Sequence, residues 1–354
     1  MLDDKNKIQA TDPGKMLDLL VSFPKQIPEA REIAKKADLS AIKTKRVKNI
    51  VICGMGGSAI GGDLVRSYAI DLLKVPIIIV RDYLLPAFVG EDSLVVASSY
   101  SGNTEETLDS FAEAKNRGCQ RIAICTGGKL AAIAKEENIP LIIIPGGLPP
   151  RAALGYGFSP LLTILEKMGF LPDRTDEIGE TIKILEEGVK LFGIEHAWET
   201  NPAKILATQM FEKLPLIYSD DWHFNSVAVR FRGQINENSK QLAYSAVLPE
   251  NNHNELVGWK ILGSLSTELV AILLTDSKIH KRVKFRMDFL EKVQKNLGAD
   301  VVHAQSRGDG ILARMFSLIQ LGDWASYYLA ILNKEDPKPV RIIDDLKSSL
   351  ANYA

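Results

Sequence analysis

The sequence predicts an α/β protein with two tandem doubly wound domains, each a mostly parallel sheet flanked by helices. From Asn49 onward, short apolar runs alternate with longer segments of helical periodicity, and a second alternating pattern starts after Asn201 and Pro202. Strands that are separated by helices pair through right-handed crossovers, which gives parallel sheets. The chain has 354 residues, of which 46% are hydrophobic, so it is long enough to bury two cores.

The elements follow in chain order. Residues 1–45 are expected to form an N-terminal helical arm that packs on a domain or on a second subunit, broken at Pro24 and Pro28. The rest of the chain divides into a first domain, a helical connector and a second domain with a C-terminal helix: residues 46–158, 159–200 and 201–354. The apolar runs that we expect to form strands are residues 50–53, 75–80, 94–97, 121–125 and 139–144, followed by 214–218, 269–274 and 301–304. In such sheets a ligand binds outside the carboxyl ends of the strands, where the turns gather.

The hydroxyl-rich turn after the third apolar run predicts an anion site. Residues 98–107 read SSYSGNTEET and lie between a buried run and a helix. A helix N-terminus presents free N–H donors and the positive end of its dipole, which favour a phosphate. A helix cap would explain one or two of the hydroxyls of Ser99, Ser101 and Thr104, but not all three together. The turn has no Lys, so a small phosphate ester suits it better than a nucleoside triphosphate.

The first Gly-rich turn has two interpretations. Residues 54–59 read GMGGSA after a strand, which satisfies the looser form of the dinucleotide fingerprint, and Asp82 lies near the end of the next strand. Short Gly patterns of this kind are common, however. We favour the second interpretation, in which the turn lets the backbone approach a small sugar phosphate and Ser58 adds a hydroxyl.

Three further residues are candidates for chemistry. Arg151 follows two prolines, where it would stabilise oxyanion charge or pair with a surface carboxylate. Glu237 lies among amides near a helix end, which suits a general base as well as a solvated carboxylate. His253 lies in a polar loop and is either a functional histidine or a solvated one. No His, Cys and Asp cluster has the spacing of metal ligands, so no metal site is predicted.

The composition argues against some classes of binding partner and favours one type of cellular compartment. The 43 Lys and Arg residues nearly balance the 44 Asp and Glu residues, so no strong field recruits nucleic acid or a membrane surface. Cys53, Cys119 and Cys125 are unevenly spaced, which favours buried thiols in a reducing compartment over a disulfide framework. No signal sequence or membrane-spanning run is seen, and we expect a cytoplasmic protein.

Taken together, these motifs resemble those of the bifunctional phosphoglucose/phosphomannose isomerases, members of the sugar isomerase (SIS) domain superfamily. The likeness covers nearly the whole chain beyond the N-terminal arm. Its most specific parts are residues 54–58 (GMGGS), 99–104 (SYSGNT), 150–154 (PRAAL), 236–238 (NEN) and 253–254 (HN).

The resemblance implies two SIS-type domains and an aldose–ketose isomerase that interconverts glucose 6-phosphate and mannose 6-phosphate with fructose 6-phosphate. It implies that Ser58, Ser99, Ser101 and Thr104 hold the sugar phosphate and that Gly56 and Gly57 contact the sugar through their backbone. Arg151 matches the arginine that steadies the enediolate, and Glu237 matches the base. His253, given by the second subunit of an obligate dimer, matches the histidine of ring opening, and Lys347 matches a lysine that assists at the ring oxygen or hydroxyl. No cofactor is implied.

Two other functions stay open from the sequence. One is a non-catalytic SIS sensor of sugar phosphates, although the N-terminal region is short for a helix-turn-helix segment. The other is an isomerase for a different phosphosugar, against which the two tandem halves argue.

Overall fold

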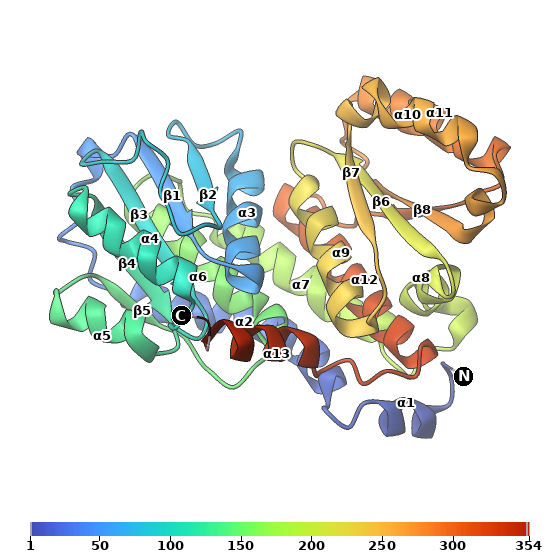
Figure 1. Cartoon of the computed structure of the whole chain (residues 1–354), viewed down its shortest axis with the longest axis horizontal. Coiled ribbons are helices and arrows are strands. Elements are labelled where there is room, and N and C mark those ends of the chain that lie inside the picture. The colour runs from blue at the N-terminus through green and yellow to red at the C-terminus, as the bar shows by residue number, and fades with distance from the viewer. Residues whose placement is uncertain (1, 352, 354) are drawn as a thin grey trace. The chain divides into compact units, whose positions relative to one another are not determined.

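The computed structural model describes residues 2–351 and 353, and the chain divides into two compact units. The five-stranded unit consists of Ser22–Lys183 and Gly310–Ala313, and the four-stranded unit of Met1–Val21, Ile184–Asp309 and Arg314–Ala354. Each unit contains one parallel sheet flanked by helices, which confirms the predicted fold class (Figure 1). The domain boundaries given above stay a prediction.

The five-stranded unit has the strand order β2-β1-β3-β4-β5, and every pairing is parallel. Its strands are β1 (Asn49–Cys53), β2 (Ile77–Val80), β3 (Ser93–Ser99), β4 (Gln120–Cys125) and β5 (Leu141–Ile143). The order reverses between β1 and β3, because β1 leads to β2 on one side and β3 leads to β4 on the other. This reversal makes the carboxyl ends of β1 and β3 the expected place for a ligand.

The two faces of this sheet are covered by different helices. The helices are α2 (Met16–Lys35), α3 (Gly56–Ala69), α4 (Glu105–Asn116), α5 (Gly128–Glu136), α6 (Leu154–Lys167) and α7 (Thr175–Phe192). Alternate residues of a strand point to opposite faces, so Ala97 of β3 packs with Phe111 of α4 and Leu130 of α5. On the other face α3 lies close to the sheet, since a Cβ on Gly62 would be 3.0 Å from Cγ2 of Ile52. The crossovers therefore place α3 opposite α4 and α5.

The four-stranded unit has the order β7-β6-β8-β9, again with parallel pairings throughout. Its strands are β6 (Leu214–Asp220), β7 (Tyr244–Leu248), β8 (Leu269–Thr275) and β9 (Asp300–Gln305). Its helices are α1 (Lys5–Thr11), α8 (Pro202–Met210), α9 (Asn225–Ser239), α10 (Glu255–Gly258), α11 (Lys281–Asn296), α12 (Ile311–Leu332) and α13 (Arg341–Ala351). The helices α2, α7 and α12 each have residues in both units. Position by position, β7, β6, β8 and β9 repeat the order of β2, β1, β3 and β4.

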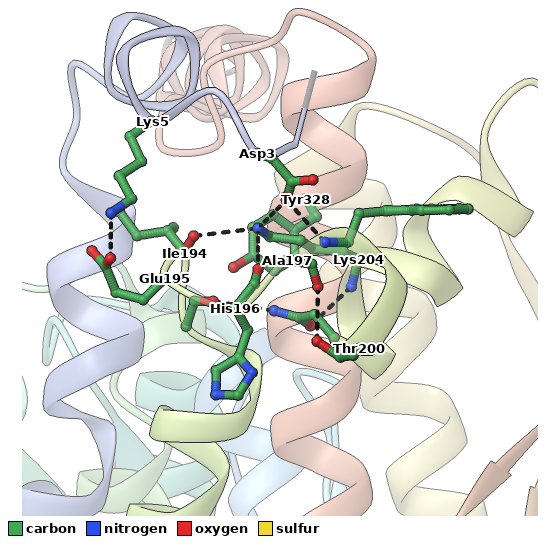
Figure 2. A network of polar contacts seen from close by, with 12 residues as sticks. Asp3, Lys5, Ile194, Glu195, His196, Ala197, Thr200, Lys204 and Tyr328 are labelled. Atoms are coloured by element: carbon green, nitrogen blue, oxygen red, sulfur yellow. Dashed lines mark hydrogen bonds and ion pairs between the residues drawn. The ribbon is translucent and has the colours of Figure 1, made fainter.

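A buried lysine of the four-stranded unit binds Asp3, which precedes α1 (Figure 2). The side chain of Lys204 is fully buried, and its Nζ donates to Asp3 Oδ1 at 2.9 Å and to the carbonyl oxygens of Ile194 at 3.3 Å and His196 at 2.6 Å. The same ammonium lies 5.6 Å from the centre of the Tyr328 ring. A buried cation needs partners of this kind, and Asp3 supplies the carboxylate among them.

One helical feature differs from the sequence expectation. Pro24 and Pro28 were expected to break the arm, but both lie inside the continuous helix α2. Its apolar face, with Phe23, Ile27 and Ala30, is buried, and burial of this face outweighs the hydrogen bonds that the prolines remove. None of the helices formed by the described residues combines the length and hydrophobicity needed to cross a bilayer.

Candidate active site

The turns that follow β1 and β3 meet at the point where the strand order of the five-stranded unit reverses. Cys53 pairs with Ala97, so the two strands end at nearly the same level. A Cβ on Gly54 would lie 2.7 Å from the carbonyl oxygen of Ser98, which shows how closely the first turn packs on the end of β3. Only glycine fits at this position.

The turn after β1 leads directly into α3. Gly56 is the first residue of this helix and has a φ of +49°, a conformation that favours glycine. The Oγ of Ser58 accepts a hydrogen bond of 3.0 Å from the backbone N–H of Tyr100, so it ties the first turn to the second. The predicted phosphate-site residues of both turns are therefore brought together.

The turn after β3 is held by its own hydroxyls. Ser99 Oγ donates to Thr104 Oγ1 at 2.9 Å and accepts from the N–H of Gly102 at 3.1 Å, while Ser101 Oγ accepts from the N–H of Asn103 at 3.2 Å. Ser99 is buried, Thr104 is half-buried and Ser101 is exposed. The geometry gives the hydroxyl of Ser99 a role inside the turn and leaves Ser101 accessible. Thr104 is at the N-cap position of α4 without a side-chain capping bond, and the first turn of this helix carries Glu105.

Residues of neighbouring loops contact the turn after β3 and hold it in place. The hydroxyl of Tyr100 accepts a hydrogen bond of 3.0 Å from the N–H of Leu148, and its carbonyl oxygen accepts one from Thr126. Burial raises the pKa of the Tyr100 phenol, so it stays neutral at physiological pH. A Cβ on Gly102 would lie 1.9 Å from the carbonyl oxygen of Gly127, so only glycine permits this approach.

Arg151 lies beside the first turn. It belongs to the short 3₁₀ helix Pro150–Ala152 and is buried, with 5% of its surface exposed. A Cβ on Gly57 would lie 2.7 Å from the carbonyl oxygen of Pro150 and 3.2 Å from the backbone nitrogen of Arg151. The five-stranded unit therefore gathers the two turns and the Arg151 segment at one end of its sheet.

A residue that sequence reasoning missed positions the Arg151 segment. Gln26 of α2 donates through Nε2 to the carbonyl oxygen of Ala152 at 2.7 Å and accepts at Oε1 from the N–H of Gly155 at 3.1 Å. Its side chain is buried. No local pattern distinguishes Gln26 from other helical glutamines, because its role depends on a contact across more than a hundred residues.

Glu237 lies in the last turn of α9 in the four-stranded unit. Its side chain is half-buried, and the end of the helix around it is fixed by other groups. Asn238 Nδ2 donates to Ser326 Oγ of α12 at 3.0 Å, and Lys240 Nζ donates to the carbonyl oxygen of Glu237 at 2.9 Å. Lys240 adopts the left-handed conformation that ends the helix.

His253 and Lys347 lie on other elements of the four-stranded unit. His253 ends the 3₁₀ helix Glu250–His253, which follows the carboxyl end of β7, and its side chain is exposed. Because α9 begins at the carboxyl edge of the sheet and Glu237 is in its last turn, Glu237 and His253 are at opposite edges of this sheet. Lys347 is on α13 with 72% of its side chain exposed, 4.0 Å from Asp344 Oδ1.

Comparisons with known proteins decide the family. Residues 45–147 match the SIS domain model, and residues 199–350 match the model of the bacterial phospho-glucose isomerase C-terminal SIS domain. A protein of Caldicellulosiruptor bescii named bifunctional phosphoglucose/phosphomannose isomerase is 45% identical over 336 residues, which is 95% of this chain and 99% of that protein. The chain belongs to the bifunctional phosphoglucose/phosphomannose isomerase family. An Aquifex aeolicus protein of the same name is 39% identical over 87% of this chain and 92% of its own length.

Solved structures agree with the fold of this family. A glucose-6-phosphate isomerase like protein from Thermus thermophilus matches with a TM-score of 0.63 over 98% of both chains, at 18% identity. The two parallel sheets are therefore tandem SIS-type domains, as the resemblance implied. Within the described part of the chain, no group of three or more His, Cys, Asp or Glu side chains is arranged to hold a metal ion.

Proposed function

We propose that this protein interconverts glucose 6-phosphate and mannose 6-phosphate with fructose 6-phosphate. The observation that carries the proposal is the near full-length similarity to relatives named bifunctional phosphoglucose/phosphomannose isomerase. The hydroxyl-lined turns at the strand-order reversal supply the feature that such substrates need, because a phosphate at a helix N-terminus meets N–H donors and hydroxyls together.

The phosphate anchors the substrate on the five-stranded unit. Ser58, Ser101 and Thr104 offer hydroxyls to its oxygens, and Ser99 holds the turn in shape through its bond to Thr104. The backbone of Gly56 and Gly57 contacts the sugar. The anchor supplies no proton transfer; it fixes C6 so that C1 and C2 are held in one place.

Proton transfer is assigned to Glu237. Its carboxylate takes the proton from C2 of the open-chain aldose, and the C–H electron pair forms the C1–C2 double bond while the C1 carbonyl oxygen becomes negatively charged. Arg151 stabilises this cis-enediolate electrostatically. The carboxylic acid then returns the proton to C1, and the proton of the C2 hydroxyl passes to the C1 oxygen as the C2 carbonyl forms, so no proton is gained or lost overall.

The same base serves both epimers. Glucose 6-phosphate and mannose 6-phosphate differ only at C2, and rotation about C2–C3 presents either proton to Glu237. The two aldoses therefore share one enediolate. No redox cofactor or metal is required, because the carbonyl acidifies the neighbouring C–H.

The arrangement of the four-stranded unit supports a homodimer in which His253 crosses to the partner. Asn225 and Glu237 are separated by roughly 18 Å along α9, since a helix rises 1.5 Å per residue. His253 lies at the edge where α9 begins, so Glu237 and His253 of one chain are far apart. Ring opening, assisted by Lys347, would then use the partner subunit's His253.

We assign the enzyme to the cytoplasm. Cys53, Cys119 and Cys125 are free and buried, which suits a reducing compartment. Burial raises the pKa of the Cys53 thiol to about 12, so it stays protonated and unreactive.

A coupled assay tests the function. Purified protein is given glucose 6-phosphate or mannose 6-phosphate, and formation of fructose 6-phosphate is followed with and without a chelator. We expect turnover of both aldoses and no effect of the chelator. Binding of sugar phosphate without turnover of either aldose would instead indicate a sensor.

A further inference from the structure

One edge of the four-stranded sheet is open where the five-stranded sheet has a further strand. β9 pairs with β8 on one side, and no strand formed by the described residues pairs with its other side. In the five-stranded unit the corresponding strand, β4, is covered by β5. Every strand in the described part of the chain already belongs to one of the two sheets, so none is left for this edge.

The backbone groups along the outer side of β9 lack partners. In a parallel ladder, residues two apart point their N–H and C=O groups to the same neighbouring strand. The N–H of Ser306 donates to the carbonyl oxygen of Thr275 in β8, so the groups of Val301, His303 and Gln305 point away from β8. Among the described residues, these groups make no backbone hydrogen bond outside the sheet. Such an edge is a template for an added strand.

The five-stranded unit shows what an edge of this kind holds. Gln305 is in the last pair of the β8–β9 ladder and Cys125 is in the last pair of the β3–β4 ladder, so the two residues correspond. The carbonyl oxygen of Cys125 accepts from the N–H of Ile144, directly after β5. The N–H of Ala123 donates to the carbonyl oxygen of Pro140, directly before β5. The equivalent groups are thus satisfied by a parallel strand.

An apolar groove follows the open edge. It has a volume of about 550 Å³, and its lining includes Val302 of β9, Leu191 of α7, and Pro202, Ile205 and Leu206 of α8. Successive side chains of a strand point to opposite faces of the sheet. Every second side chain of an added strand would therefore enter this groove.

The opposite face of β9 is polar. His303 and Gln305 are exposed there, and Nε2 of His303 lies 3.1 Å from Oε2 of Glu291 in α11. The side chains of an added strand that point to this face would remain in water. The occupant that fits is therefore apolar at alternate positions and polar between them.

A cation without an anionic partner lies at the carboxyl end of the groove. Arg307, two residues after β9, lines the groove, and its guanidinium lies 5.4 Å from the centre of the Phe192 ring. Its Nη2 is buried without a hydrogen-bond partner. Glu187, an exposed acid of α7, acts on the guanidinium from beyond ion-pair distance. A guanidinium in this state suits a carboxylate, which it can bind through two parallel hydrogen bonds.

Parallel pairing decides which end of the occupant meets Arg307. β9 runs toward Arg307, so a strand parallel to β9 also ends there. The group that completes the site is then a carboxylate at the carboxyl end of the occupant. Two copies of β9 related by a two-fold axis would run antiparallel, so they do not reproduce the pairing of β4 with β5.

We propose that the open edge of β9 binds the extended C-terminal peptide of another protein as a fifth, parallel strand. The peptide backbone would bind the outward groups of Val301, His303 and Gln305, and its alternate apolar side chains would enter the groove. Its terminal carboxylate would bind Arg307. In strand addition of this kind, main-chain hydrogen bonds give affinity and alternate side chains give specificity. The proposal does not depend on the proposed function.

A synthetic heptapeptide tests the proposal. The probe is acetyl-KTVTVTV, which has valine at alternate positions and a free C-terminal carboxylate; binding is measured by calorimetry at up to about 1 mM peptide. We expect saturable binding, together with slower hydrogen exchange of the amides of Val301, His303 and Gln305. The matched control is the same peptide with a C-terminal amide, whose Kd should be about 10-fold higher or more.

Two substitutions test where the peptide binds. His303→Pro removes an outward N–H that the ladder with β8 does not use, whereas His303→Ala keeps it; only the proline variant should raise Kd, by about 10-fold. Arg307→Gln should make the carboxylate and amide peptides bind equally, a difference that general destabilisation does not produce. Arg282→Gln, at an exposed arginine of α11, should keep the preference for the carboxylate.

Several results would overturn the proposal. These are no binding of the peptide, equal binding of its two forms to the wild type, or protection of amides elsewhere than at the edge of β9. Slow exchange of the His303 and Gln305 amides without peptide would also overturn it, because the edge would then already be covered.

Discussion

The two units share a strand order but differ in what they place at the carboxyl ends of their central strands. In the five-stranded unit, β3 is followed by a turn of small hydroxyls and glycine. In the four-stranded unit, β8 is followed by Asp276, which accepts from Ser306 Oγ at 2.6 Å and from Arg314 Nε at 2.8 Å. Asp220, at the end of β6, is also buried.

The two units share a strand order, but the groups at the ends of their central strands have different charge and hydrogen-bonding capacity. A buried carboxylate with its own cationic partner already fills the anion position of the four-stranded unit, and it would repel a phosphate. The same position in the five-stranded unit is neutral and rich in donors. We therefore expect the five-stranded unit, and not the four-stranded unit, to bind the phosphate of the substrate.

The largest expected effect is a loss of kcat when the proposed base of the four-stranded unit is replaced. Glu237→Gln should lower kcat by about 10²–10⁴, the usual contribution of a positioned base, because the amide cannot accept the C2 proton. Binding of fructose 6-phosphate, measured by calorimetry, should change little. The control is Glu335→Gln, an exposed acid of the same unit. Turnover close to that of the wild type in Glu237→Gln would show that Glu237 is not the general base.

The next effect concerns the close approach of the first turn to the Arg151 segment. Gly57→Ala should lower the free energy of unfolding by about 1–3 kcal/mol and reduce kcat, because its Cβ would meet the carbonyl oxygen of Pro150 at 2.7 Å. Gly179→Ala in α7 meets open space and should stabilise by up to about 1 kcal/mol. Denaturant unfolding compares the two. Equal free energies of unfolding for the two variants would mean that the first turn and the Arg151 segment move apart at little cost.

A pair of serines in equivalent turns sharpens the comparison between the units. Ser101→Ala should raise KM for each aldose roughly 10- to 100-fold, the value of one hydrogen bond to a charged group. Ser277→Ala, in the turn after β8, removes an exposed hydroxyl from the other unit and should leave KM unchanged. If both substitutions raised KM alike, the assignment of the phosphate to one unit would be wrong.

The smallest effect is a pH dependence of stability in the four-stranded unit. Burial raises the pKa of Asp220, opposed by hydrogen bonds from the backbone of His223 and Trp222. A carboxyl whose folded pKa exceeds its unfolded value of about 3.9 stabilises the fold below that value, and this contribution is lost as the pH rises through the folded pKa.

The Asp220→Asn variant lacks this titration. The stability of the wild type relative to this variant should therefore fall between about pH 4 and the folded pKa, as measured by urea unfolding at a series of pH values. A constant difference across that range would show that Asp220 is not desolvated.

Local sequence was sufficient for much of the fold. The predicted run at residues 94–97 lies within β3, and α4 begins at Glu105, directly after the hydroxyl-rich turn. The helix end that contains Glu237 was also placed correctly near its position in α9. These features depend on contacts between near neighbours, such as the bond from Ser99 to Thr104. The strand β7 and the long apolar helix α12 were not predicted, since their apolar runs have no distinctive period.

The sequence by itself determined the family and the two parallel sheets, because these follow from periodicity and a specific set of motifs; the phosphate site at the hydroxyl-rich turn stays a prediction. Tertiary structure alone decided that Pro24 and Pro28 lie inside a helix and that Gln26 holds the Arg151 segment. It also placed Glu237 and His253 at opposite edges of one sheet. Each of these depends on packing between segments far apart in the chain, and burial of a shared face can outweigh a local preference of a few kcal/mol.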